Sequence, residues 1–135
     1  MVTAVDPDTN RVYSSVDKAS AIAAVLLRTA KPGEHTGPYI REVSGVLYEL
    51  RQRGLRLRNL GFRAIPGGYY SEDVEMFLGH LLSLGYATQR SPIKLTPEGQ
   101  QFCMEILDEE ANANGRELAN LEKAVDEVLG RTTSP

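Results

Sequence analysis

The chain has 135 residues, a net charge of −3 and 41% hydrophobic residues. This composition is that of one folded domain with a core, and it excludes a disordered chain. No apolar run reaches the ~18–20 residues that span a bilayer, and the N-terminus lacks a basic-then-apolar leader, so no membrane association is expected. Cys103 is the only cysteine, which excludes an internal disulfide and favours a cytoplasmic protein.

Charge divides the chain into two parts. Residues 1–97 carry 12 Lys and Arg against 9 Asp and Glu, a net charge of +3. Residues 98–135 carry 3 Lys and Arg against 9 Asp and Glu, a net charge of −6. The mildly basic front and the acidic tail therefore indicate two surfaces with different roles.

The first part of the sequence predicts two helices behind an N-terminal arm. Residues 1–15 are rich in turn formers, and a small hairpin and a loose arm are equally good interpretations of them. Apolar residues recur at helical spacing over 16–30, with Ser15 as the expected N-cap. A second helix is expected over 38–53, because an apolar stripe runs through it and Gly54 suits its left-handed terminus.

The helical pattern is interrupted before the third helix. Residues 55–70 begin with alternating Leu and Arg and end in glycines, which predicts a short extended segment followed by a glycine-rich loop. A third helix is expected over 71–84, with Ser71 as its N-cap and Gly85 after its end. Its apolar residues fall on one face, so it should pack on the core.

Residues 86–101 combine the signals of a β-hairpin and of a capped helix. Strand-like triplets at 86–88 and 93–95 flank a polar turn. Thr96 stands where an N-cap belongs, and Pro97 fits the first helical position. A helix, a hairpin and a capped helix in this order are typical of a winged-helix domain.

The expected fold is therefore mainly α-helical with a small β-hairpin wing (α+β). The arm occupies residues 1–15, and the winged-helix domain covers residues 16–100. A C-terminal dimerisation segment, either one long helix or a helix pair, covers residues 101–130.

The tail has a heptad pattern, as in helices that pack against other helices. The eight seam positions, seven of them apolar, are Met104, Leu107, Ala111, Asn114, Leu118, Leu121, Val125 and Val128. Asn114-Gly115 interrupts the helix and can kink or split it. We expect a homodimer formed through Leu118, Leu121, Val125 and Val128, since two-fold dimers are the commonest oligomers. The alternative is that the chain turns at Gly115 and folds the last helix back onto its own core.

The order of elements, with GGYYSEDVEMFLGHLLSLGY followed by IKLTPEG, resembles bacterial and archaeal winged-helix proteins. Regulators of the PadR and MarR type have this plan, with a winged helix followed by a long dimerising helix. Gly68-Tyr69-Tyr70-Ser71-Glu72 is similar to the opening of the equivalent helix in a group related to the Panacea antitoxin domain, except that Tyr69 replaces a proline. The resemblance covers about residues 38–107. It implies the fold more specifically than the function.

The basic residues favour binding of double-stranded DNA. Five arginines lie within 13 residues that contain no acid, and two basic residues of the wing extend the set: Arg51, Arg53, Arg56, Arg58, Arg63, Arg90 and Lys94. Guanidinium groups pair well with phosphates, which supply most non-specific DNA affinity. Alternatively, these arginines protect a strand edge or pair with the acidic tail. Glu72, Asp73 and Glu75 in the third helix oppose a polyanion.

The sequence predicts neither an enzyme nor a cofactor or metal site. His35 and His80 are the only histidines and Cys103 is the only thiol, and no His, Cys and carboxylate cluster has metal spacing. His80 is expected to be a partly buried structural residue, and Cys103 a core residue. Two functions remain. The preferred one is a small DNA-binding regulator acting as a homodimer, and the alternative is an antitoxin-like or adaptor module that binds a protein partner.

Overall fold

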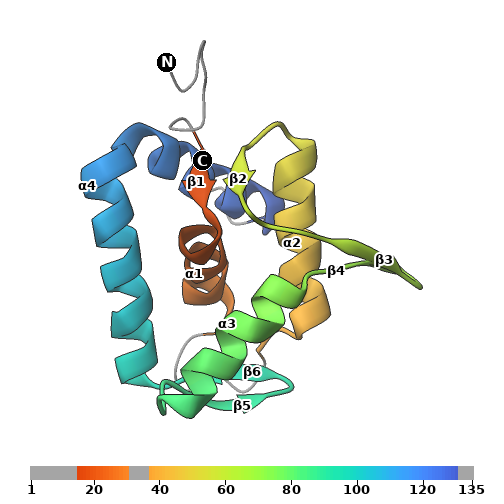
Figure 1. Ribbon diagram of the computed structural model, residues 1–135, viewed down its shortest axis with the longest axis vertical. Coiled ribbons are helices and arrows are strands. Elements are labelled where there is room, and N and C mark those ends of the chain that lie inside the picture. Colours follow the sequence, from red (N-terminus) through yellow and green to blue (C-terminus); the bar gives the residue numbers. More distant parts are fainter. Residues whose placement is uncertain (1–14, 31–36, 131–135) are drawn as a thin grey trace.

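The computed structural model describes residues 15–30 and 37–130. The expected arm, apart from Ser15, and His35 lie outside these ranges. The described part is mainly helical, with three small strand pairs (Figure 1). None of its helices is both long and apolar enough to cross a membrane. Its elements are β1 (Val16–Asp17), α1 (Lys18–Thr29), α2 (Ile40–Gln52), β2 (Leu57–Arg58), β3 (Arg63–Ile65), β4 (Gly68–Tyr70), α3 (Glu72–Ser83), β5 (Ala87–Arg90), β6 (Ile93–Leu95) and α4 (Pro97–Val128).

Helix α1 lies at the centre of the core. Every residue from Ser20 to Leu26 is buried, and α2, α3 and α4 surround the helix (Figure 1). Four of these residues are Ala or Ser, whose small side chains allow neighbouring helices to approach closely from several sides. A helix buried on more than one face has no polar side, and this is why its sequence reads as apolar almost all round.

The three strand pairs connect the helices. Strand β1 pairs in parallel with β2, and β5 pairs with β6 as the predicted hairpin. The expected loop before α3 is wrong, because β3 and β4 form a second antiparallel hairpin in which Ile65 is paired with Gly68. Pro66 and Gly67 make its turn, and Gly67 has a φ of 88° that glycine adopts without cost.

Helix caps confirm one prediction and correct two. Thr96 caps α4, since its hydroxyl accepts a hydrogen bond from the Gly99 amide at 3.0 Å. Helix α1 begins after Asp17 instead of Ser15, and the Asp17 carboxylate accepts a hydrogen bond from the Ala19 amide. Ser71 has the N-cap position of α3 but its hydroxyl makes no capping bond. Its backbone amide instead donates to the Ser44 hydroxyl at 3.0 Å.

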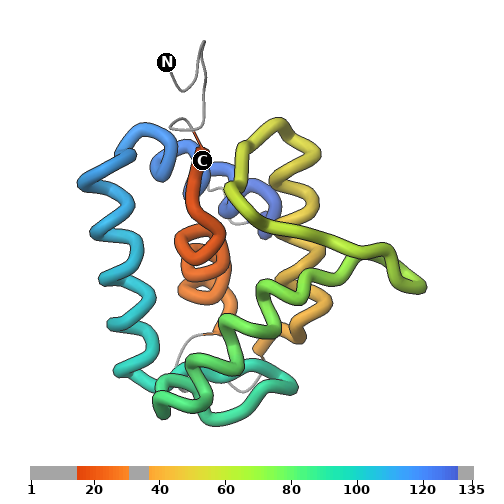
Figure 2. Tube along the Cα trace, viewed as in Figure 1, coloured from red at the N-terminus to blue at the C-terminus, as the bar shows by residue number. Residues whose placement is uncertain are grey.

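Helix α4 bends at Asn114, whose φ of −155° and ψ of 51° are not helical. Beyond the bend the helix crosses back over the molecule towards α2 (Figure 2). Leu118, Leu121 and Val125 are buried in the core of their own chain, and Val128 packs against it. These four residues therefore do not form a free dimerisation seam in this conformation, and the fold-back alternative describes them correctly.

The first half of α4 also departs from the expected seam. Met104 is 45% exposed and Ala111 is exposed, whereas Cys103 is fully buried. The buried stripe passes through Cys103 and Leu107, one residue away from the predicted start. This error arose because Met104 and Cys103 are both apolar, and only the partner surface distinguishes them.

Candidate functional site

Four of the seven predicted DNA-binding residues already form ion pairs within the chain. Arg53 pairs with Glu49 and, at 3.2 Å, with Glu127 of α4. The Arg58 guanidinium donates to Ser15 and lies 3.7 Å from Asp17. The other two pairs join the hairpins to α3: Arg63 with Glu72 at 3.1 Å, and Arg90 with Glu75 at 3.7 Å.

Arg51, Arg56 and Lys94 have no carboxylate partner among residues 15–30 and 37–130. The Arg51 guanidinium lies 4.6 Å from the centre of the Phe62 ring and 5.4 Å from that of Tyr48. This stacking on aromatic faces supplies no opposite charge, and Arg51 is exposed to solvent. Arg56 is exposed and Lys94 is partly exposed.

The structure separates some of the basic residues along α2, although Arg63 and Arg90 both pair with acids in the first turn of α3. The β5–β6 hairpin meets the start of this helix, where the Ile93 amide donates to the Pro38 carbonyl at 2.7 Å. Arg51 and Arg56 lie at the other end. Helix α2 has 13 residues and is therefore about 20 Å long at about 1.5 Å per residue. Arg51 therefore lies about one length of α2 from the end of the helix that the β5–β6 hairpin contacts.

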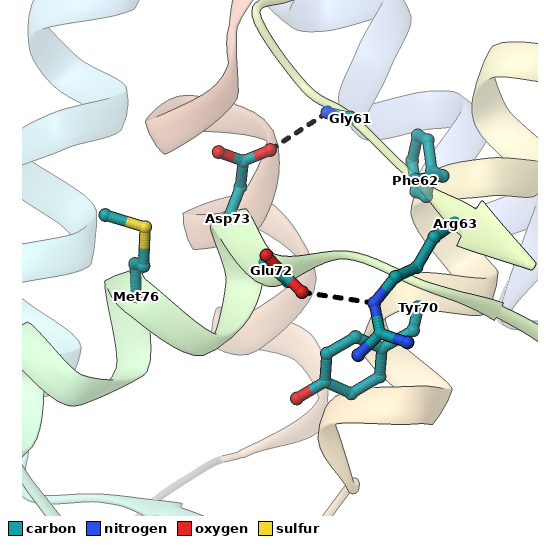
Figure 3. Close-up of a pocket in the computed structure, with 7 residues that line it drawn as sticks. All are labelled: Gly61, Phe62, Arg63, Tyr70, Glu72, Asp73 and Met76. Carbon is teal, nitrogen blue, oxygen red and sulfur yellow. Dashed lines mark hydrogen bonds and ion pairs between the residues drawn. The ribbon is translucent and has the colours of Figure 1, made fainter. Parts of the chain in front are cut away.

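The first turn of α3 carries three acids, and each is neutralised by a cation from another element. Glu72 and Glu75 pair with Arg63 and Arg90 as described above. The Asp73 carboxylate accepts a hydrogen bond from the Gly61 amide at 2.9 Å (Figure 3). It also accepts one from the Lys18 ammonium at 2.9 Å. The first turn of α3 is thus fixed from three sides and presents little net charge.

Two cavities border this part of α3. One has a volume of about 300 Å³ and is lined by the 61–63 segment, by Tyr70 and by the first two turns of α3 (Figure 3). The other, of about 290 Å³, lies between α1 and α3 and is lined by Lys18, Ala19, Ile22, Asp73, Met76, Phe77 and His80. Asp73 and Met76 border both cavities. We call this surface the α3 groove.

Met76 is the outstanding residue of the α3 groove. Its exposed fraction is 72%, the highest among the large hydrophobic residues that the structure describes as exposed. Its flexible thioether adapts to differently shaped apolar partners, which is why methionine is common at adaptable binding surfaces. Phe62, Phe77 and the ring of Tyr70 add apolar surface beside it.

Ionisable groups in and near the α3 groove have shifted pKa values. Burial of the Asp73 carboxyl raises its pKa, but the Gly61 amide and Lys18 outweigh this and hold the pKa below its ordinary value. Burial, followed by the nearby Glu75, raises the pKa of Tyr70. On α2, contact with Tyr69 raises the pKa of Tyr48, with a smaller contribution from burial, and the two rings stack with centroids 3.7 Å apart. Tyr48 and Tyr70 therefore remain neutral hydrogen-bonding groups at physiological pH.

The histidine and cysteine of the described chain are placed differently from each other. His80 is exposed at the edge of the α3 groove, so the expectation of a partly buried histidine is wrong. Cys103 is buried in the core as predicted, and burial raises the pKa of its thiol to about 12. A thiol with this pKa is protonated at neutral pH. No group of three or more His, Cys, Asp or Glu with metal-binding geometry occurs in the parts of the chain that the structure describes.

Sequence reasoning identified the acids of α3 but missed the groove. The available signal was Met76 itself, a large apolar residue two positions from Val74 and therefore off the buried stripe of Val74, Leu78 and Leu81. The cavities could not be inferred, because their walls come from segments distant in sequence. Comparison with protein-family models, with curated proteins and with solved structures finds no match.

Proposed function

We propose that this protein is a protein-interaction module with a winged-helix-like arrangement, which binds an apolar segment of a partner protein in the α3 groove. The observation that carries this proposal is the 72% exposure of Met76 between two cavities of about 300 and 290 Å³. Concave apolar surfaces with a few polar groups at their rims are the usual form of binding sites. Each cavity has room for one large apolar side chain of the partner.

The charges around the groove support a protein partner more than a nucleic acid. In a plain helix-turn-helix, the helix at the position of α3 enters the major groove of DNA. Helix α3 contains no Lys or Arg, and the cations nearest its first turn pair with its own acids. Phosphate binding here would require breaking these pairs, whereas an apolar segment would leave them intact.

The proposal predicts that a charge at position 76 abolishes binding to groove-directed peptides. Peptides are selected from a phage-displayed library of random short sequences on the wild-type protein, and their affinities are measured by fluorescence anisotropy. Met76→Glu should weaken binding by about tenfold or more, equivalent to at least about 1.4 kcal/mol, because it replaces the apolar side chain between the two cavities with a carboxylate. The fold should persist, since the side chain is mostly exposed.

Met104→Glu is the matched control. Met104 is 45% exposed on α4 and does not line either cavity, so the same change of residue should leave peptide affinity unaltered. Equal losses in both variants would contradict the proposal, and so would selected peptides that bind both variants as well as the wild-type protein.

DNA binding is the second candidate function, supported by the three basic residues without a carboxylate partner in the described structure. A labelled random-sequence duplex is titrated at low and near-physiological salt. Arg51→Ala with Arg56→Ala should weaken binding and reduce the magnitude of the salt slope by about two, because two phosphate contacts are lost. Arg116→Ala with Lys123→Ala removes the same charge from exposed positions on α4 and is the control. No binding at low salt, or equal losses in both pairs, would exclude this candidate.

A further inference from the structure

The bend in α4 is confined to a single residue. Between Pro97 and Val128, the backbone leaves the helical conformation at Asn114 alone. The helix resumes at once, and residues 111–113, 115 and 116 around the bend are exposed. A hinge of one residue between two helical segments requires little change of backbone to become continuous helix.

The buried stripe of α4 runs through the bend without a change of register. The successive members of this stripe are Cys103, Leu107, Leu118, Leu121 and Val125. Their spacings of 4, 11, 3 and 4 residues are close to one, three, one and one turns of a helix with about 3.6 residues per turn. In a straight helix they would all face the same way. The apolar pattern is therefore compatible with a bent and with a straight α4.

The bent form is held by contacts between the residues after the bend and the surface of α1 and α2. A second copy of this chain could supply the same residues to that surface. We define the C-terminal arm as residues 116–129. Beyond its buried Leu and Val side chains, it is held by Arg28, whose guanidinium pairs with Asp126 at 2.7 Å and with Glu122 at 3.8 Å, and by the pair of Arg53 with Glu127. All these contacts join the arm to α1 and α2.

The Asn114 side chain secures the bend itself. Its amide donates to the Ser15 carbonyl at 2.8 Å and to the Glu110 carboxylate at 3.2 Å. Ser15 also accepts from Arg58, so the bend is tied to the start of α1 and to β2. Removing the Asn114 amide would release the hinge and leave the core contacts of the arm unchanged.

We propose that α4 straightens at Asn114 and exchanges its C-terminal arm between two copies of this chain. In the exchanged dimer, each arm would lie on α1 and α2 of the other copy and make the contacts described above. Closed and exchanged forms then differ only at the hinge, where the straight helix gains the backbone hydrogen bonds that the bend interrupts. The partner surface is thus the arm's own binding site on an identical molecule.

The proposal predicts opposite effects of two hinge variants on oligomeric state. Asn114→Ala with Gly115→Ala removes the hinge contacts and raises helix propensity, so it should increase the dimer association constant at least tenfold. Gly115→Pro can begin the second helical segment but cannot lie inside a continuous helix, so it should be monomeric. Size-exclusion chromatography with light scattering measures both against the wild-type protein. A straightening variant that stays monomeric at all concentrations would overturn the proposal.

A cross-linking experiment identifies the interface. Arg28→Cys and Asp126→Cys are introduced into separate chains with Asn114→Ala and Gly115→Ala, the chains are mixed, and a short bis-maleimide is added. Exchange brings these positions together across the dimer and should give a cross-link between the two different chains. Cys103 is buried, and its pKa of about 12 keeps it unreactive. A dimer without this cross-link would be formed by another surface and would contradict the exchange.

Discussion

Asp73 connects three separate parts of the chain through one carboxylate. It binds the Lys18 ammonium at the start of α1 and the Gly61 amide before β3, while lying in the first turn of α3. A carboxylate near a helix N-terminus is also favoured by the positive end of the helix dipole. Asp73 therefore fixes the geometry of the α3 groove, and its charge is neutralised by the Lys18 ammonium.

The lowered pKa of Asp73 predicts a pH-dependent contribution to stability. A carboxyl group whose pKa is lower in the folded than in the unfolded protein stabilises the fold above about pH 4, and the contribution disappears as pH falls through the folded-state pKa. Urea unfolding at pH 7 should show Asp73→Asn to be less stable by about 1–2 kcal/mol, with the difference shrinking towards pH 3. Asp108→Asn, at an exposed position of α4, should show no difference at either pH.

At the scale of elements, the contact between the start of the β5–β6 hairpin and α4 depends on a glycine. A Cβ atom at Gly99 would collide with the Tyr86 carbonyl oxygen, which is backbone and cannot rotate away. The Tyr86 carbonyl also accepts the Thr96 amide at 2.9 Å, so its position is fixed by the helix it approaches. The backbone at the start of α4 therefore packs directly against the backbone of Tyr86, the residue before β5.

This packing predicts opposite signs for two Gly→Ala changes within helices. Gly99→Ala should destabilise the protein by about 1–3 kcal/mol, because the methyl group forces backbone apart. Gly79→Ala, in α3, should stabilise it by about 0.5–1 kcal/mol, because no atom lies within 4 Å of the added Cβ and alanine is the better helix former. Denaturant unfolding of the two variants measures both effects. A neutral or stabilising Gly99→Ala would show that the space around Gly99 adapts.

At the scale of the whole molecule, local signals in the sequence were sufficient for the four helices. The Thr96 cap, the glycines after α2 and α3, and the apolar stripes located the helices to within a few residues, because these signals act over one or two turns. The β3–β4 hairpin was missed because its pairing is weakly encoded, with Pro66-Gly67 marking a turn but not the strands beside it.

The charges were the hardest feature to interpret from the sequence. Arg53 and Glu127 are 74 residues apart, and Lys18 and Asp73 are 55 residues apart, so nothing local indicates that they pair. The same limit applies to α4: Asn114-Gly115 marked the place of the bend, but the side towards which the arm turns depends on α1 and α2. Because of such ion pairs, only Arg51 and Arg56 of the five arginines between residues 51 and 63 lack an acidic partner among the described residues.

The central position of α1 also determines when this chain can finish folding. Arg28, early in the chain, contacts Asp126 across 98 residues, and the surface of α1 is complete only when the last turns of α4 have been synthesised. Contacts this distant in sequence slow folding, because a long loop must close before they form. During translation the face of α1 that α4 covers stays exposed until α4 has been synthesised, so nascent chains should depend on chaperones until then.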